Sequence, residues 1–249
     1  DKAAIMTIDA VGEWTSSAIF MANRKDGKVT ISPVDVSPFP HSLGLVYSAF
    51  TAFLGFKVND GECSTMALAS FGKPTYVDIL RRIIQIRPDG TYSVDMKWFD
   101  FRDDSKTPVT KRFIEHFGSP RSYKSKLSFD ALDNSATADD DNVRYADIAC
   151  SLQAVFQEAV VAYAKRAQRL TGAANLCYAG GGALNCVANS YLDAQKVFSE
   201  IYIPPDPGDG GGAMGAALYA ESVFGGLVDR PRKIHPYFGS DIDEEQFES

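Results

Sequence analysis

Two stretches of glycine constrain the fold of this chain more than any other feature. Gly180 to Gly182 follow a short apolar run, and Gly208 to Gly212, with Asp209 among them, follow the apolar run 201–203. A segment with helical spacing comes after each, so the chain repeats strand, glycine turn and helix within residues 175–220. Glycine permits close backbone approach, and a helix N-terminus presents free N–H groups to an anion or nucleotide. We therefore expect both turns to line one nucleotide cleft.

The other apolar runs predict an α/β fold. Three β-rich runs at the start predict an antiparallel meander, with a hairpin turn at 25–28. Apolar residues at helical spacing predict a buried helix in 41–56 and a long helix in 143–170. Between these we expect short helices ending near Gly72 and over 76–84, a small surface hairpin around 87–90 and a short helix at 109–117. The order along the chain is β-β-β-α…α-β-α-β-α.

Composition excludes several classes of function. The 249 residues have a net charge of −7 and no long basic stretch, which argues against bulk electrostatic binding to nucleic acid or anionic membrane. No apolar run approaches the roughly 18 residues of a membrane span, and no signal peptide opens the sequence. The cysteines are scattered without a CxxC pair, which argues against zinc and favours a reducing, cytoplasmic compartment: Cys63, Cys150, Cys177 and Cys186. The start at Asp1, with a strand almost at once, predicts a truncated or processed chain.

Several ordered motifs resemble one family. YAGGGALNCVANSYL (178–192) is followed by PPDPGDGGGAMGAAL (204–218), and upstream stand TIDAVGEWTSS (7–17), SLGLVYSAFTAFLGFKVNDGE (42–62) and YADIACSLQAVFQE (145–158). Together they resemble the O-carbamoyltransferase family of the nodulation protein NodU and cephalosporin carbamoyltransferase type. KIHPYFGSDIDEEQF, near the end, is similar to the family's PYLGPEYSDEEI.

The resemblance implies a fold, a domain order and an activity. The fold is an actin/Hsp70-like (ribonuclease H-like, ASKHA) half-repeat similar to the tRNA threonylcarbamoyl-transferase (Kae1-like) domain. The core would span 1–230 with a variable insertion at about 75–142, and 231–249 would link to an absent C-terminal YrdC-like domain. That domain would make carbamoyl-adenylate from carbamoyl phosphate and ATP. This region would pass the carbamoyl group to a hydroxyl of a sugar, antibiotic or other small-molecule acceptor, and the fragment alone would be inactive.

The resemblance also assigns site residues. Asp9 and Glu13 are the candidate catalytic residues, and Asp9 and Asp209 the candidate ligands of a divalent metal, expected to be iron. The candidate adenylate-binding residues lie on the two glycine stretches and the helix between them: Gly180, Gly181, Gly182, Asn185, Asn189, Gly208, Gly210 and Gly211. Two simpler interpretations stay open, namely that Asp9 and Glu13 are turn acids and that Asn185 and Asn189 cap or pack a helix.

Three departures from the family pattern limit these assignments. The family's His-x-x-x-His metal pair is missing, since the histidines here are His41, His116 and His235, so we expect weak metal binding or none. Ser64 stands where the family has a lysine. We also expect the family's C-terminal domain to be missing from this chain. A sugar or acid kinase of the same superfamily and a non-catalytic nucleotide-binding domain therefore remain alternatives. The oligomeric state is open, with a homodimer among the options.

Overall fold

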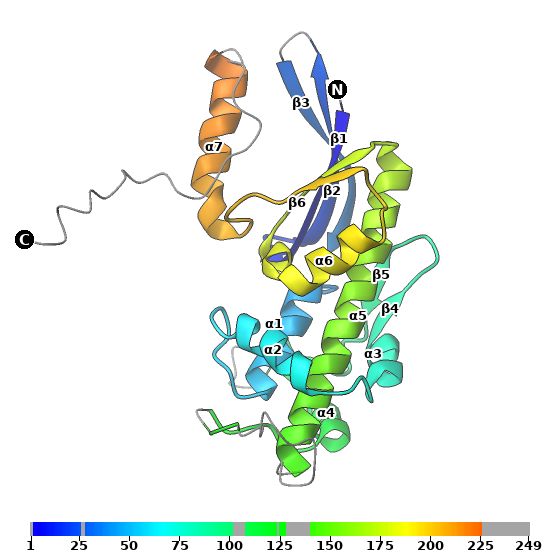
Figure 1. Ribbon diagram of the computed structural model, residues 1–249, viewed down its shortest axis with the longest axis vertical. Coiled ribbons are helices and arrows are strands. Elements are labelled where there is room, and N and C mark those ends of the chain that lie inside the picture. The colour runs from blue at the N-terminus through cyan, green and yellow to red at the C-terminus, as the bar shows by residue number, and fades with distance from the viewer. Residues whose placement is uncertain (1, 26–27, 102–107, 124, 128–139, 226–249) are drawn as a thin grey trace, which may run out of the picture.

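A computed structural model shows a mixed five-stranded sheet with helices packed around and below it (Figure 1). It describes residues 2–25, 28–101, 108–123, 125–127 and 140–225. The strand order is β3-β2-β1-β6-β7. β1 (Lys2–Gly12), β2 (Thr15–Lys25) and β3 (Lys28–Pro38) form the antiparallel meander, whereas β6 (Asn175–Ala179) and β7 (Glu200–Tyr202) run parallel to β1. The predicted α/β fold and meander are confirmed, and residues 26 and 27 of the predicted turn lie outside the described residues.

The long helix α5 (Asp140–Thr171) runs along the sheet and continues below it (Figure 1). It contacts β1 and β2 as well as the helices below the sheet, and its buried face has side chains spaced three and four residues apart, among them Ile148, Leu152 and Val160. β1 supplies the facing layer through Ala4, Met6 and Ile8, whose alternation is the period-two pattern of a strand with one buried face. The helix predicted for 143–170 is thereby confirmed.

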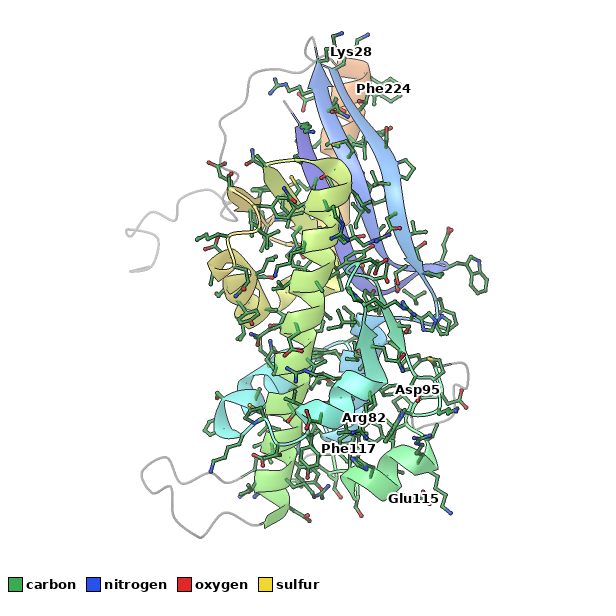
Figure 2. All side chains as sticks on the ribbon, turned by 90° about the vertical axis from the view of Figure 1, so that its right-hand side faces the viewer. Lys28, Arg82, Asp95, Glu115, Phe117 and Phe224 are labelled. Atoms are coloured by element: carbon green, nitrogen blue, oxygen red, sulfur yellow. The ribbon has the colours of Figure 1, made fainter. Side chains whose placement is uncertain are left out.

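The lower part of the molecule is helical and rich in aromatic side chains. It comprises α1 (Leu43–Phe53), α2 (Glu62–Leu68) with a 3-10 turn at Ala69–Phe71, α3 (Val77–Ile83) and α4 (Lys111–Phe117). The rings of Phe50, Phe113 and Phe117 meet at centroid distances of 4.5–5.5 Å, mostly edge to face. Figure 2 labels Phe117 beside Glu115 on the same short helix. Phe117 is buried whereas Glu115 is exposed, so α4 is amphipathic.

The hairpin predicted at the surface is present, but several of its side chains are buried. β4 (Ile84–Ile86) pairs with β5 (Tyr92–Val94), and Ile84, Tyr92 and Val94 are all buried. The described part of 75–142, which we expected to be a variable insertion, contributes these residues to the same hydrophobic core as β1 and α5. Its limits as an insertion stay a prediction. The predicted linker 231–249 lies outside the described residues.

Both predicted strand–glycine–helix units are present. After β6 comes a 3-10 turn, Gly181–Leu184, and then α6 (Cys186–Ala194). After β7 comes a second 3-10 turn, Asp209–Gly211, then α7 (Gly212–Ala220) and a π-helical turn, Glu221–Gly225. In each unit the glycines fall at the carboxyl end of a parallel strand, where open α/β sheets bind ligands.

Gly72 provides a test of the packing between the 3-10 turn after α2 and helix α5. A Cβ atom on Gly72 would overlap the carbonyl of Ala146 in α5. We expect Gly72→Ala to lower the free energy of unfolding by about 1–3 kcal/mol, as overpacking against backbone does. The matched control is Gly215→Ala in α7, where a Cβ meets nothing within 4 Å. It should raise helix stability by up to about 1 kcal/mol. Urea unfolding measures both, and equal effects would contradict the packing argument.

Candidate functional site

The two glycine turns lie against each other at one edge of the sheet. The backbone N–H of Gly180 donates a hydrogen bond to the carbonyl of Pro207, with an N···O distance of 2.8 Å. This contact follows from topology, because β6 and β7 are parallel neighbours and their carboxyl ends meet at the same edge. The structure therefore brings the Gly180 and Gly208 regions together.

Asp9 lies directly beside the first turn. The register between β1 and β2 shifts between Ile8 and Gly12, so Asp9 sits at a bulge where the strand turns away from its partner. A Cβ on Gly181 would lie 3.0 Å from the Asp9 Oδ1 atom, and a Cβ on Gly180 would overlap the carbonyl oxygen of Ile8. Gly180 has φ of +91°, and Gly182 packs on Ile8 as well. Small residues are thus needed here for close packing of β6 on β1.

Helix α1 fixes the Asp9 corner from the other side. The Oγ of Ser42 donates to the carbonyl of Ala10 at 2.5 Å and lies 3.1 Å from that of Asp9. It also accepts the N–H of Leu45 at 3.0 Å, which makes Ser42 the N-cap of α1. A Cβ on Gly44 would lie 2.6 Å from the Asp9 carbonyl oxygen. Sequence reasoning missed both residues, although a serine just before an apolar helical run is a recognisable cap signal.

The second turn also requires glycines, because larger residues would clash with a neighbouring side chain or backbone. A Cβ on Gly210 would overlap the carboxylate of Asp206, and one on Gly211 would overlap the Asp206 carbonyl oxygen. Gly208 is half-buried near Leu184, and Asp209 is exposed at the start of the 3-10 turn. The backbone of this turn is therefore folded tightly around Asp206, a residue that the sequence analysis did not single out.

The residues predicted to hold a metal do not make a metal site by themselves. In the described part of the chain, no group of three or more histidine, cysteine, aspartate or glutamate side chains is gathered as a metal ion would require. Asp9 uses Oδ1 to accept the N–H of Ala10 at 2.7 Å. The assignment of Asp9 and Asp209 to a metal remains a prediction from the resemblance.

Asn185 is held in a buried network within the protein. Its Oδ1 accepts the N–H of Ala188 at 2.9 Å, which caps α6, and also the Nε2 of Gln153 at 3.0 Å. Its Nδ2 donates back to Gln153 Oε1, and Tyr47 donates to the same Oε1. Asn185 is only 8% exposed. The network joins α1, α5 and α6, so the capping interpretation describes what this side chain does here.

The side chains of Asn189 and Glu13 make fewer hydrogen bonds within the described residues than that of Asn185. Asn189 donates from Nδ2 to the carbonyl of Ala183 at 2.7 Å, while its Oδ1 is buried without a partner among the described residues. Glu13 is exposed in the turn after β1, with φ of +57°. Within the described residues, its side chain makes no hydrogen bond or ion pair. Glu13 is thus a turn residue at the tip of the meander, and Asn189 has one amide oxygen available.

The remaining residues noted in the sequence have ordinary surroundings. His41 is half-buried, and its Nδ1 accepts the N–H of Val94 at 3.2 Å. His116 packs edge-on against the Trp98 ring, with centroids 5.5 Å apart. Ser64 lies half-buried on α2, and His235 is outside the described residues.

Comparison with known proteins identifies the family. The sequence model described as Carbamoyltransferase N-terminus matches residues 1–218. The chain belongs to the carbamoyltransferase family. It is 40% identical over 258 residues to the uncharacterized protein sll1178 of Synechocystis, covering 100% of this chain and 38% of that protein.

Other carbamoyltransferase-family relatives share the same region. Nodulation protein NolNO of Sinorhizobium fredii is 26% identical, over 99% of this chain and 32% of that protein. Nodulation protein NolO of Bradyrhizobium diazoefficiens is 27% identical, over 99% of this chain and 40% of that protein. The chain therefore spans about a third to two fifths of these relatives. Among solved structures, CasPhi-2 (Cas12j) bound to crRNA aligns at a TM-score of 0.30 and 12% identity, over 83% of this chain and 41% of that one, which is too little likeness to support an inference.

A helix that spans a bilayer must be both long and predominantly apolar. Across the described ranges, none of the helices is both long and apolar enough to span a membrane.

The Asn185 network predicts a stability effect that does not need a ligand. Asn185→Ala removes the α6 cap and leaves Gln153 without its amide partner in a buried position. We expect the free energy of unfolding to fall by about 1–3 kcal/mol. Gln153→Ala and the double variant complete a thermodynamic cycle by chemical denaturation. Because the two amides bond reciprocally, the double variant should cost less than the sum, and strict additivity would contradict the pairing.

Proposed function

We propose that the protein containing this chain transfers a carbamoyl group to a hydroxyl group, and that this chain forms the region where the acceptor meets the activated carbamoyl. The observation that best supports it is that the two glycine turns meet and that Asp9 lies beside the first of them. Gly180 bonds to Pro207, and Gly181 faces the Asp9 carboxylate, at the carboxyl edge of parallel strands β1, β6 and β7. Membership of the carbamoyltransferase family gives the chemistry to which this edge would contribute.

The fold that we propose is one half-repeat of the actin/Hsp70-like architecture. Its support is the order of strands, an antiparallel β3-β2-β1 meander extended by parallel β6 and β7. In that arrangement, nucleotide phosphates would approach the glycine backbones of the two turns. Gly181, at the start of the first 3-10 turn, is exposed and has no side chain to block such an approach.

In the proposed reaction, ATP and carbamoyl phosphate give carbamoyl-adenylate in a separate YrdC-like domain. There, water would release phosphate from carbamoyl phosphate, and the resulting carbamate would attack the α-phosphorus of ATP and release pyrophosphate. Attack of the acceptor hydroxyl on the carbamoyl carbon then releases AMP. The hydroxyl proton must go to a base, and Asp9 is the carboxylate beside the first glycine turn, whereas Asp206 is enclosed by the backbone of the second. We assign it that role, with Glu13 as a hydrogen-bonding residue near the carbamoyl group. Holding the two reactants together at this edge of the sheet would supply the rest of the rate enhancement.

The proposal predicts the products of the complete protein. With ATP, carbamoyl phosphate and an acceptor bearing a hydroxyl group, it should release AMP and pyrophosphate. Asp9→Asn should lower the rate of carbamoyl transfer by roughly 100-fold or more, as loss of a general base does. The matched control is Asp193→Asn. Asp193 is an exposed aspartate of α6 that pairs with Lys196, and this variant should keep full activity. Product analysis by chromatography measures both.

Other product patterns would contradict the proposal. Release of ADP would indicate a kinase, and AMP formed without carbamoyl phosphate would indicate different chemistry. Binding of ATP with no turnover by the complete protein, over a panel of sugar and small-molecule acceptors, would indicate a non-catalytic nucleotide-binding domain. Unchanged transfer by the Asp9→Asn variant would remove Asp9 from the mechanism while leaving the family assignment in place.

A further inference from the structure

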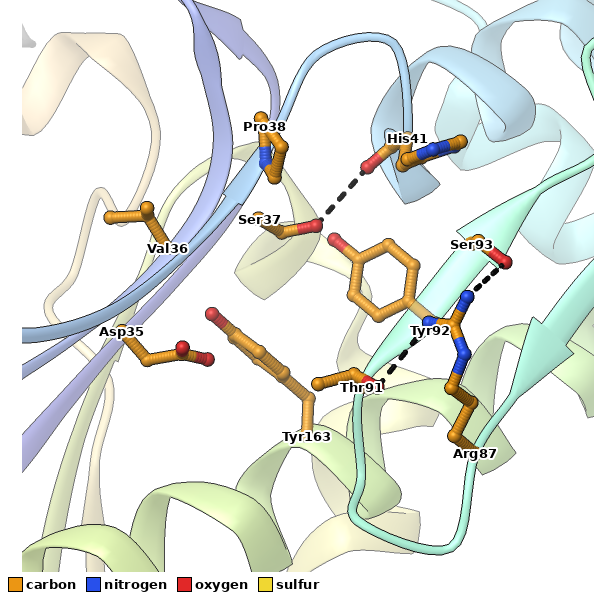
Figure 3. Close-up of a pocket in the computed structure, with 10 residues that line it drawn as sticks. All are labelled: Asp35, Val36, Ser37, Pro38, His41, Arg87, Thr91, Tyr92, Ser93 and Tyr163. Atoms are coloured by element: carbon orange, nitrogen blue, oxygen red, sulfur yellow. Dashed lines mark hydrogen bonds between the residues drawn. The ribbon is translucent and has the colours of Figure 1, made fainter.

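A pocket of about 230 Å³ lies away from the glycine turns (Figure 3). It is enclosed by the end of β3, the β4–β5 hairpin and helix α5, which supply Asp35, Ser37, Arg87, Tyr92 and Tyr163. Its lining includes no residue of the two glycine turns. The pocket therefore belongs to a different part of the molecule from the proposed transfer site, and its interpretation does not depend on that proposal.

Tyr163 gives the pocket a hydrogen-bond donor that the protein does not use. The residue is 1% exposed, and its hydroxyl has no partner among the described residues. Figure 3 shows its ring entering from α5 with the hydroxyl directed toward β3. Burial raises the pKa of Tyr163, so the group stays a neutral O–H donor. The neighbouring Tyr92 differs, because its hydroxyl lies 2.5 Å from Ser17 Oγ. A buried hydroxyl without a partner is costly, which favours a ligand acceptor at this position.

Arg87 places a positive charge beside the same space. Its guanidinium donates only to neutral hydroxyls, those of Thr91 at 3.3 Å and Ser93 at 3.1 Å. Within the described parts of the chain, no carboxylate lies at ion-pair distance from it. The hairpin thus orients Arg87 without a direct ion pair, and Asp89 attracts it only from a greater distance, which leaves the guanidinium N–H groups able to bind an anion.

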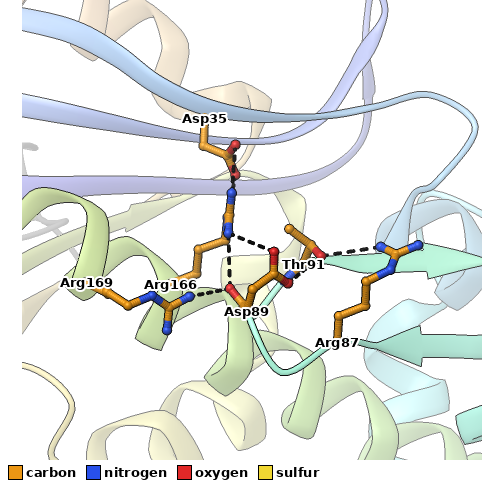
Figure 4. A network of polar contacts seen from close by, with 6 residues as sticks. All are labelled: Asp35, Arg87, Asp89, Thr91, Arg166 and Arg169. Atoms are coloured by element: carbon orange, nitrogen blue, oxygen red, sulfur yellow. Dashed lines mark hydrogen bonds and ion pairs between the residues drawn. The ribbon is translucent and has the colours of Figure 1, made fainter.

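The acidic side chain in the pocket is already paired (Figure 4). Asp35 binds Arg166 in a bidentate manner, at 2.8 and 3.2 Å, and both side chains are largely buried. Arg166 also contacts Asp89, whose backbone carbonyl accepts from Arg169. Arg166, Arg169 and Asp89 are not part of the pocket lining, so the charged side chains of the lining are Asp35 and Arg87. Because Arg166 balances Asp35, Arg87 is the uncompensated charge of the lining, although the chain as a whole is acidic.

We infer that this pocket binds a compact anionic group, a carboxylate or a phosphate of a small molecule, through the Tyr163 hydroxyl and the Arg87 guanidinium. Both donors suit an oxyanion, because one gives a neutral O–H and the other a charged N–H. The volume is below that of a typical pocket for a drug-sized ligand, so it fits a head group with the rest of the molecule outside. The anion would satisfy the hydroxyl that the fold leaves unpaired.

The test is isothermal titration calorimetry on the complete protein. The probes are inorganic phosphate, acetate and, as a neutral comparison, glycerol. We expect saturable binding of phosphate or acetate, and the tighter of the two identifies the class of anion. Tyr163→Phe and Arg87→Gln should each weaken that binding about tenfold or more, as loss of a hydrogen bond to a charged group does.

Two matched variants serve as controls. Tyr178→Phe also removes a buried hydroxyl that has no partner among the described residues, but Tyr178 does not line the pocket. Arg82→Gln removes an exposed arginine of α3 outside the pocket. Both should bind the anion like the parent protein. Tyr163→Phe should fold normally, because it removes only an unpaired hydroxyl, and its thermal unfolding checks this.

Three results would overturn the inference. One is the absence of saturable binding by both anions. Another is anion binding that is equal in the parent, Tyr163→Phe and Arg87→Gln proteins, which would place the anion elsewhere. The third is glycerol binding that weakens in these two variants when anion binding does not, which would make the pocket a neutral polyol site.

Discussion

The close approach of backbones at one edge of the sheet is the constraint on which the site depends. Three parallel strands, β1, β6 and β7, end there, and the turns that follow must pack without side chains between them. The Gly180 N–H reaches the Pro207 carbonyl, and Gly180 and Gly182 rest on Ile8. Any larger residue would push the first turn away from β1 and from Asp9. The glycines are therefore required by packing as much as by any ligand, and one structural need accounts for their clustering in the sequence.

A second constraint ties the helices to this edge. Asn185 caps α6 and pairs with Gln153 of α5, which also accepts from Tyr47 of α1. Three helices thus meet through one buried polar network, and such networks favour a single arrangement when every member is satisfied. Ser42 links the start of α1 to the sheet in a similar way, because it hydrogen-bonds to the backbone of Asp9 and Ala10. The Asp9 corner is consequently held by β6 on one side and by α1 on the other.

Much of the fold could be predicted from periodicity, and the local partners of the site residues could not. The β-rich run at 3–8 and the three-and-four spacing of 143–170 are local features of the sequence, and the structure confirms both elements. The meeting of the two glycine turns followed from the parallel order of their strands. Asn185 was expected to face a ligand, but its partner Gln153 is 32 positions away, and sequence spacing gave no sign of it. The burial of Tyr92 depends on α5 and β2 in the same way. The predicted metal and adenylate contacts remain predictions.

The net charge of the chain does not determine what a single pocket binds, because the fold decides which charged side chains lie next to it. A chain with a charge of −7 is a poor candidate for binding anions by its overall field, and the sequence analysis excluded polyanionic partners on that ground. Yet charges separated by more than a Debye length of about 8 Å are largely screened, so the nearest side chains decide what a pocket attracts. Near Tyr163 those are Asp35 and its partner Arg166, and the pocket lining adds Arg87. They come from β3, the β4–β5 hairpin and α5, which only the folded sheet brings together. An acidic protein can therefore hold a pocket with an uncompensated arginine, provided that the neighbouring aspartate is paired within the protein before a ligand arrives.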